Sequence, residues 1–343
     1  MRRRPLLALG LLLAASCSGL DPEEEQRVED YLNRAIRYYD AGDLARAEQQ
    51  ARLGLELDPE NGELYHVLGR TLLRREELKL VARAKAPLEK AYELKPDYRT
   101  AWSLGEFHLR YAEFLLGSVV LLEDRIPPLE LRGDQAGVED LRRRAEHQRR
   151  VADEHLHEAL ELLSSSLAEA QDQPYVLRLL ANCQSHLGRD AEALQTLDTL
   201  IQNLIASRRF KNQQLALQDL SVAEELMWRR VLETDIRMEI EAHGLAAAIH
   251  KRNQNYAAAI EHLDEILKLD PERVPEYFNR GMCHYWLGQI GRAVADMQTF
   301  IRKTSLSMDS EEVSRALDII AEYRARSPGT AAASPAGDPP LGD

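Results

Sequence analysis

The sequence has few of the residues that build β-sheets or disulfide-stapled folds. Aromatic residues make up 6% of its 343 residues, three cysteines are present, and runs of β-branched residues are scarce. Alanine, leucine, glutamate and arginine, which favour helices, are abundant instead. This composition excludes a β-rich fold and predicts an all-α protein.

Motifs that mark catalytic or cofactor sites are also missing. The chain has no Gly-rich phosphate loop, no Gly-x-Ser-x-Gly and no pair of cysteines at metal-binding spacing. We therefore expect no enzyme, no cofactor and no small-molecule substrate. In the helix expected over 147–161, His157 and Glu161 stand one turn apart. Two ligands do not make a metal site, so we expect a solvated helix face there. A metal-dependent enzyme with its site in this helix is the weaker alternative.

The charge balance limits the class of partner. Acidic side chains outnumber basic ones by 57 to 44, and the formal net charge is −13. Because phosphate backbones bind to basic surfaces, nucleic acid is excluded as a partner. The same negative charge repels anionic lipid headgroups, so the folded surface is not expected to bind a membrane by itself.

The N-terminus has the features of an export signal. The basic segment Arg2–Arg4 precedes the apolar segment Leu6–Leu13, which is too short to span a bilayer as a permanent helix. Small residues then lead to Cys17. This arrangement resembles the lipobox of bacterial lipoproteins. The resemblance implies that residues 1–17 form a lipoprotein signal peptide and that Cys17 is acylated, for example with palmitate.

The residue after this cysteine bears on the location. Ser18 follows Cys17, and no Asp occupies that place. By resemblance to lipoprotein sorting, this implies an outer-membrane lipoprotein that faces the periplasm and is anchored by its lipid alone, with 18–27 as a short linker. Ordinary signal-peptide cleavage after Ser16 is the alternative, and it would give a secreted periplasmic protein.

The rest of the chain repeats its own pattern. Residues 28–59 and 240–271 place small or apolar residues at the same offsets, and both segments end in Asp-Pro. In a frame of 34 residues, further copies begin at Val274 and Pro174. Each copy holds two runs of helical periodicity separated by a short polar turn, with small residues at positions 8 and 20 that allow close helix approach.

This pattern resembles the tetratricopeptide repeat family. The resemblance implies an all-α, right-handed superhelical solenoid of antiparallel helix pairs over 28–326, which ends in a capping helix over 309–326. The frame breaks at 98–173 and 208–239, which we interpret as diverged units. The first of these is either one over-long unit or hides a degenerate repeat. Residues 327–343 combine Pro, Gly, Ala and Ser, a composition that predicts a disordered tail.

Two further features of the sequence predict local structure. Cys183 and Cys283 occupy the same position in separate repeats, too far apart for a disulfide, so both are expected as buried hydrophobes. The apolar run over 115–122 predicts either a core helix or an exposed docking patch.

The concave face of the solenoid is the expected binding surface. In the family it is lined mainly by positions 2, 5, 9, 12 and 13 of each first helix, which here hold many Arg, Lys and aromatic residues. The resulting partner-binding candidates are Tyr39, His66, Arg70, Arg74, Trp102, Arg110, Tyr175, Arg178, Asn182, Lys251, Phe278, Met282 and Tyr285.

These positions suit an acidic, partly hydrophobic peptide. Arg178 and Asn182 stand where some family members clamp a terminal carboxylate, but Leu245 replaces the second Asn, so a full clamp is not expected. The alternative is that all these side chains only form contacts with neighbouring helices of the same chain.

Anchor and repeats together predict a membrane-anchored scaffold or adaptor in the bacterial cell envelope that binds a protein or peptide partner in its groove. The alternative is a structural envelope lipoprotein that self-associates through its apolar segments.

Overall fold

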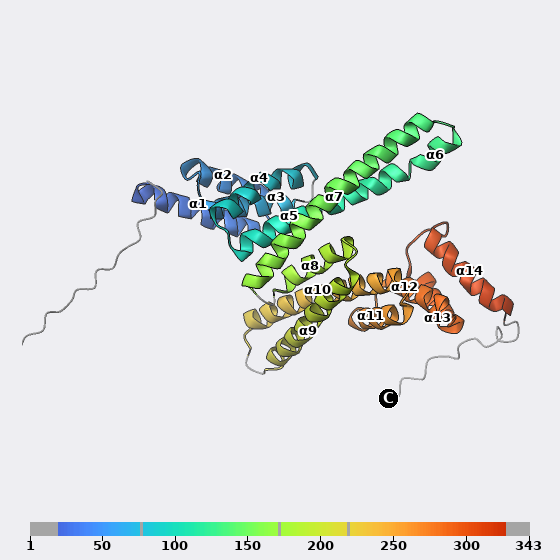
Figure 1. Ribbon diagram of the computed structural model, residues 1–343. Coiled ribbons are helices and arrows are strands. Elements are labelled where there is room, and N and C mark those ends of the chain that lie inside the picture. The colour runs from blue at the N-terminus through green and yellow to red at the C-terminus, as the bar shows by residue number, and fades with distance from the viewer. Residues whose placement is uncertain (1–19, 76–77, 171–172, 218–219, 327–343) are drawn as a thin grey trace, which may run out of the picture. The chain divides into compact units, whose positions relative to one another are not determined.

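The structure is a computed structural model that describes residues 20–75, 78–170, 173–217 and 220–326 (Figure 1). These residues form fourteen α-helices and no strand, which confirms the all-α prediction. They divide into two compact units, with the division between Glu169 and Ala170. The predicted lipidation site Cys17 and the predicted disordered tail over 327–343 lie outside the described residues.

The first unit consists of three helical hairpins, in which each helix packs antiparallel to its partner (Figure 1). Its helices are α1 (Pro22–Asp40), α2 (Leu44–Leu57), α3 (Gly62–Arg74), α4 (Leu78–Leu94), α5 (Tyr98–Glu123), α6 (Ile126–Leu131) and α7 (Gln135–Glu169). The short α6 lies in the connection between the long partners α5 and α7. Leu64, Leu72, Leu88 and Phe107 lie in the core that joins the hairpins.

The second unit also has three hairpins, followed by one further helix. Its helices are α8 (Pro174–His186), α9 (Asp190–Leu215), α10 (Val222–Arg252), α11 (Tyr256–Leu269), α12 (Val274–Trp286), α13 (Ile290–Lys303) and α14 (Glu311–Arg326). Helix α14 packs on α13 through Val313, Ala316 and Ile319, and it is the predicted capping helix. Its first turn is capped by Ser310, whose Oγ accepts from the Val313 amide at 3.4 Å.

Small residues set the spacing of the hairpins as the frame predicts. Position 8 is held by glycine or a buried alanine in all six hairpins. The alanines that face it from the second helices, Ala47, Ala84, Ala193, Ala259 and Ala293, are all 0% exposed. Because none of these residues has a side chain beyond Cβ, the two helix backbones can approach closely.

The turn after each regular first helix has one geometry. Gly42, Gly188 and Gly288, at position 15 of their frames, have φ of +79°, +70° and +71°, and Gln254 takes the same place with φ of 58°. In each turn the next amide donates to a carbonyl five residues back, as from Asp43 to Tyr38 at 2.9 Å. This is the Schellman ending of a helix, in which a left-handed residue satisfies the last carbonyl groups.

The predicted linker over 18–27 is too long. Helix α1 begins at Pro22, because Asp21 and Glu24 form a capping box and proline is favoured in the first helical turn. The Asp21 carboxylate accepts from the Glu24 amide at 2.8 Å.

The two segments that break the frame are extensions of helices. Residues 98–169 form a single long hairpin of α5 and α7, with no further repeat in its described part. Residues 208–239 were predicted as a diverged unit, but they are the end of α9 and the start of α10. Helical periodicity simply continues past the frame. Arg208 pairs with the buried Glu239 at 2.9 and 3.0 Å, and Lys211 pairs with Asp235.

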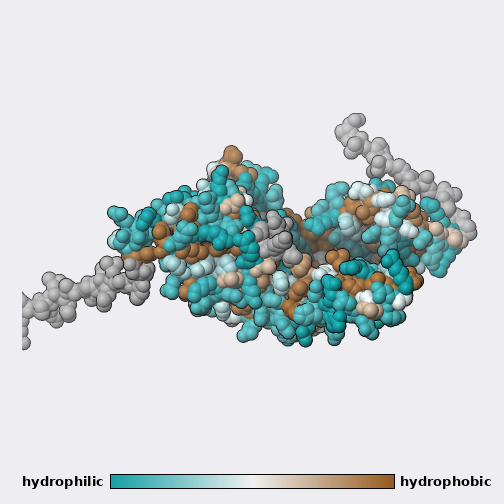
Figure 2. Space-filling view, turned by 90° about the horizontal axis from the view of Figure 1, so that it is seen from above, coloured by the Kyte–Doolittle hydropathy of each residue, from teal (hydrophilic) through white to brown (hydrophobic). Residues whose placement is uncertain are grey.

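The apolar run over 115–122 is part of a core helix. Leu115, Val119 and Leu122 are buried, and the last two pack with α7, whereas Val120 and Leu121 on the opposite side are 56% and 68% exposed. Among the described residues, no helix combines the length and apolar character needed to cross a bilayer. Figure 2 shows a mostly hydrophilic surface with separate apolar patches.

The two cysteines of the described chain behave as the frame predicts. Cys183 and Cys283 are both 0% exposed, and neither forms a disulfide.

Candidate functional site

Four of the predicted groove residues lie together on the first helices of unit 1. The Arg70 guanidinium of α3 lies over the Trp102 ring of α5 at 4.2 Å and over the Tyr39 ring of α1 at 5.3 Å. Arg74 lies over the same Tyr39 ring at 5.0 Å and donates to the Tyr39 carbonyl oxygen at 2.8 Å. Tyr39, Arg70, Arg74 and Trp102 are named the aromatic–arginine stripe.

Two cations of this stripe have no carboxylate partner among the described residues. Within the residues that the structure describes, neither Arg70 nor Arg74 forms an ion pair with a carboxylate. The neighbouring Arg110 differs, because it contacts the buried Glu106 carboxylate at 2.8 Å and the Leu73 carbonyl at 3.4 Å. A guanidinium that stacks on a ring still directs N–H groups from its edge, so the stripe can bind a carboxylate.

His66 was expected to line the groove of unit 1, but the structure buries it between helices. It is 7% exposed, and its Nε2 lies 2.8 Å from the Ser103 hydroxyl of α5. Burial, together with the charge of Arg70, lowers the pKa of His66 to about 4, so its ring is neutral near pH 7. His66 joins α3 to α5 and does not face a partner.

Ile36 is an exposed residue on this face that sequence reasoning missed. It is 40% exposed and lies one turn before Tyr39 on α1. Ile36 stands at position 9 of its repeat, which is a groove position, so the frame could have identified it. It adds apolar area beside the stripe.

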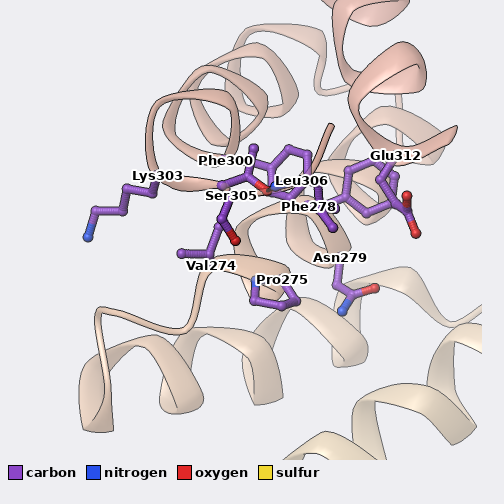
Figure 3. A pocket seen from close by; sticks show the side chains of 10 residues that line it. Val274, Pro275, Phe278, Asn279, Phe300, Lys303, Ser305, Leu306 and Glu312 are labelled. Atoms are coloured by element: carbon purple, nitrogen blue, oxygen red, sulfur yellow. Dashed lines mark hydrogen bonds between the residues drawn. The ribbon is translucent and has the colours of Figure 1, made fainter. Parts of the chain in front are cut away.

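In unit 2 the predicted residue Phe278 lines a pocket of about 430 Å³ (Figure 3). The Phe278 ring of α12 lies 5.2 Å from the Phe300 ring of α13. Figure 3 shows the two rings close to Leu306, with Lys303 and Glu312 at opposite sides. The frame gave Phe278 but not the pocket, because the loop over 304–306 and α14 lie outside the regular repeat.

The other candidates of α10 and α12 contact neighbouring helices. Lys251 donates to the Asn279 side chain at 3.2 Å, and the Tyr285 hydroxyl donates to Glu322 of α14 at 3.0 Å. Met282 packs against the core between α13 and α14. For these residues the structural alternative fits the observed contacts.

The partial carboxylate clamp on α8 is similarly occupied. Arg178 lies over the Tyr175 ring at 5.1 Å and 3.7 Å from the Glu241 carboxylate of α10. Asn182 lies half-buried on the same helix. Because the chain supplies its own carboxylate to Arg178, this place is a weaker candidate than the stripe for an external acidic group.

The His/Glu-rich stretch of α7 has the expected solvated face, but one of its histidines turns away from that face. His157 is exposed, and its Nδ1 donates to the Asp153 carbonyl at 2.9 Å. His155 instead turns toward α5, where its Nδ1 lies 2.7 Å from Nδ1 of His108. Sequence reasoning missed His108, because only the pairing of α5 with α7 brings residues 47 positions apart together.

Comparison with known families agrees with the helix geometry. Models of the tetratricopeptide repeat match residues 246–318 and residues 150–204. These two ranges therefore contain tetratricopeptide repeats. A search of curated protein sequences gives no match.

Solved structures share the fold. The type IV pilus biogenesis factor PilW is 14% identical with a TM-score of 0.50, over 87% of this chain and 100% of PilW. PilF of Pseudomonas aeruginosa is 13% identical with a TM-score of 0.49, over 86% of this chain and 99% of PilF. A chain of the APC/C hetero-tetramer Cut9–Hcn1 is 14% identical with a TM-score of 0.49. The match covers 86% of this chain and less than half, 46%, of that one.

Of these three, only PilW reaches a TM-score of 0.50, and at 14% identity that likeness shows the fold alone. Repeats of this kind present an extended surface, and they are typical of non-enzymatic scaffolds that bind protein or peptide partners.

Proposed function

We propose that this protein is a scaffold that binds an acidic, partly hydrophobic segment of a partner protein on the aromatic–arginine stripe. The observation that supports the proposal most is the pair of guanidinium groups held on aromatic rings without a carboxylate partner in the described chain. The −13 net charge makes this local cationic face unusual for the molecule.

Stacking on the aromatic rings prepares both guanidinium groups for binding. A guanidinium held on a ring loses less side-chain freedom when it pairs with a carboxylate, so more of the interaction energy contributes to binding. Arg70 and Arg74 would contact acidic side chains or a chain terminus. Trp102, Tyr39 and Ile36 would supply apolar contact area, and Trp, Tyr and Arg dominate the energetics of protein interfaces.

The test is charge reversal within the stripe. The double variant Arg70→Glu, Arg74→Glu is compared with wild type on an array of acidic peptides that contain Phe and Leu. We expect binding to weaken about 30-fold or more, which corresponds to the ~2 kcal/mol of a binding hot spot.

A matched control changes the same charge elsewhere. Arg143→Glu, Arg144→Glu alters two exposed arginines of α7 and produces the same change in net charge. This variant should bind like wild type. Equal losses in both variants would indicate a general charge effect, and no loss in the stripe variant would contradict the proposed site.

We also propose that the scaffold is anchored in the cell envelope, as an outer-membrane lipoprotein acylated at Cys17 that faces the periplasm. The support is the N-terminal sequence. In cells, Cys17→Ser should move the protein from the membrane fraction to the soluble fraction, and unchanged fractionation would reject lipidation.

Self-association is the alternative function, and one surface favours it. Large apolar side chains at the tip of the α9–α10 hairpin are exposed, namely Phe210, Leu217, Val222, Leu226, Met227 and Val231. Light scattering on the protein without residues 1–17 separates the two functions. A monomer at micromolar concentration would exclude stable self-association.

A further inference from the structure

Three potential ligand atoms converge between α5 and α7. Nδ1 of His108 lies 2.7 Å from Nδ1 of His155 and 2.6 Å from Oε2 of Glu158. The His155 nitrogen lies 3.8 Å from the same carboxylate oxygen. We propose that His108, His155 and Glu158 form a binding site for a divalent transition-metal ion of the zinc type.

Two facing helices position these ligands. His155 and Glu158 are three residues apart on α7 and so lie on the same helix face, and His108 meets them from the antiparallel α5. This arrangement is one in which helical bundles build metal centres, with ligands three residues apart on one helix and others on its partner.

Aromatic packing fixes both imidazoles before any ion binds. The His155 ring meets the Tyr111 ring edge-to-face at 4.9 Å, and the His108 ring meets Phe107 edge-to-face at 5.1 Å. His108 is only 4% exposed. A ligand set held by packing loses little freedom on coordination, which favours tight binding.

The three contacts have few hydrogens to share. Nδ1 of His108 carries at most one hydrogen, and it lies within hydrogen-bond distance of both Nδ1 of His155 and Oε2 of Glu158. Without an ion, a single three-centre hydrogen bond has to serve both contacts. A cation between the three atoms would engage a lone pair of each.

The surrounding charge favours a cation. A cavity of about 350 Å³ beside the site is lined by His108, Glu158, Glu161, Lys85 and Glu89 among others. Lys85 opposes a cation, but its ammonium group lies 3.7 Å from the Glu89 carboxylate, which offsets it. Glu158 and Glu161 then leave the cavity negative. Two nitrogen ligands favour zinc-type ions over magnesium or calcium, which prefer oxygen.

The ligand number suggests an accessible ion. Three protein ligands leave a fourth position for water, as in zinc sites that are not purely structural. The 57% exposure of the Glu158 side chain gives the ion a route from solvent.

The experiment uses the full chain, purified without a histidine tag and stripped with a chelator. Zn²⁺ is titrated by calorimetry, and Co²⁺ is titrated by visible absorption, which reports nitrogen and oxygen coordination directly. We expect one equivalent to bind. His155→Ala and Glu158→Gln should each weaken binding about 100-fold or more, beyond the loss typical when a supporting group is removed.

The chain provides a matched control on the same helix. His157→Ala removes an exposed imidazole two residues from His155, and this variant should bind like wild type. Glu158→Gln changes an exposed side chain, so a loss in that variant is not explained by unfolding. Circular dichroism should show the same helicity in all variants.

Three outcomes would overturn the proposal. These are no saturable Zn²⁺ or Co²⁺ binding by wild type, wild-type affinity in both His155→Ala and Glu158→Gln, or an equal loss in His157→Ala.

Discussion

Gly69 illustrates how one atom sets the distance between two helices. A Cβ at this position of α3 would lie 2.5 Å from Cγ and 3.2 Å from the backbone nitrogen of Leu88 in α4. Gly69→Ala gains up to ~1 kcal/mol of helix propensity. It should lose about 1–3 kcal/mol through overpacking, because a backbone atom cannot move aside as a side-chain tip can. We therefore expect net destabilisation, measured as a lower urea midpoint by circular dichroism.

Gly117 of α5 is the control for this prediction. No atom lies within 4 Å of a Cβ built there, and the position is exposed. Gly117→Ala should therefore be neutral or stabilising by up to ~1 kcal/mol. If Gly69→Ala behaves in the same way, the close approach of α3 and α4 does not require glycine.

At the residue scale, the repeat frame predicted which way a side chain points better than it predicted whether that side chain is buried. It placed Arg70 and Trp102 on one face, where they meet. It placed His66 on that face as well, but the ring is covered by α5 and reaches Ser103. Position in a repeat fixes which way a side chain points, whereas exposure depends on the size of residues in the next repeat.

The turns connect residue choice to element geometry. Gln254 occupies with φ of 58° the left-handed place that glycine holds in the turns at Gly42, Gly188 and Gly288. A left-handed residue with a Cβ costs roughly 1–2 kcal/mol. Glycine at this position would remove that cost, but its greater freedom in the unfolded chain offsets part of the gain in stability. Gln254→Gly should therefore stabilise the chain by up to about 1 kcal/mol, measured as a higher urea midpoint.

The equivalent turn between α12 and α13 offers the reverse experiment. Gly288→Ala places a Cβ at φ of +71°. It should destabilise by about as much as Gln254→Gly stabilises. A gain from Gly288→Ala would show that these turns tolerate side chains.

At the element scale, the regular hairpins and the capping helix were predictable. Their signals are local: small residues, a left-handed turn residue and an N-cap. The lengths of α9 and α10 were not predictable, because a 34-residue frame does not indicate that a helix continues beyond its repeat. The ion pair between Arg208 and the buried Glu239 joins the extended parts, and its partners are 31 residues apart.

The whole molecule should be sensitive to mild acid. Burial is the largest cause of a lowered pKa in three histidines. The pKa is lowered to about 4 in His66, to about 3 in His108 and to about 4 in His243. In the unfolded chain these rings titrate near pH 6.5. Below that pH the unfolded state binds protons that the folded state does not, so stability is full above pH 6.5 and decreases toward pH 4.

The expected slope is roughly 1.4 kcal/mol per pH unit for each of the three imidazoles. Urea unfolding between pH 7.5 and 4.5, with chelator present, measures it. His66→Gln removes one titrating ring and should reduce the slope by roughly 1.4 kcal/mol per pH unit. A stability that is flat over this range would show that the rings are not buried in solution.

The sequence by itself determined the all-α fold, the frame of the repeats and the face on which the aromatic–arginine stripe lies. Each of these follows from periodicity within about 34 residues. Only the tertiary structure decided that His66 is covered, that Phe278 borders a pocket and that His108 meets His155. Those outcomes depend on which helix packs against which, and pairings between distant residues leave no local pattern in the chain.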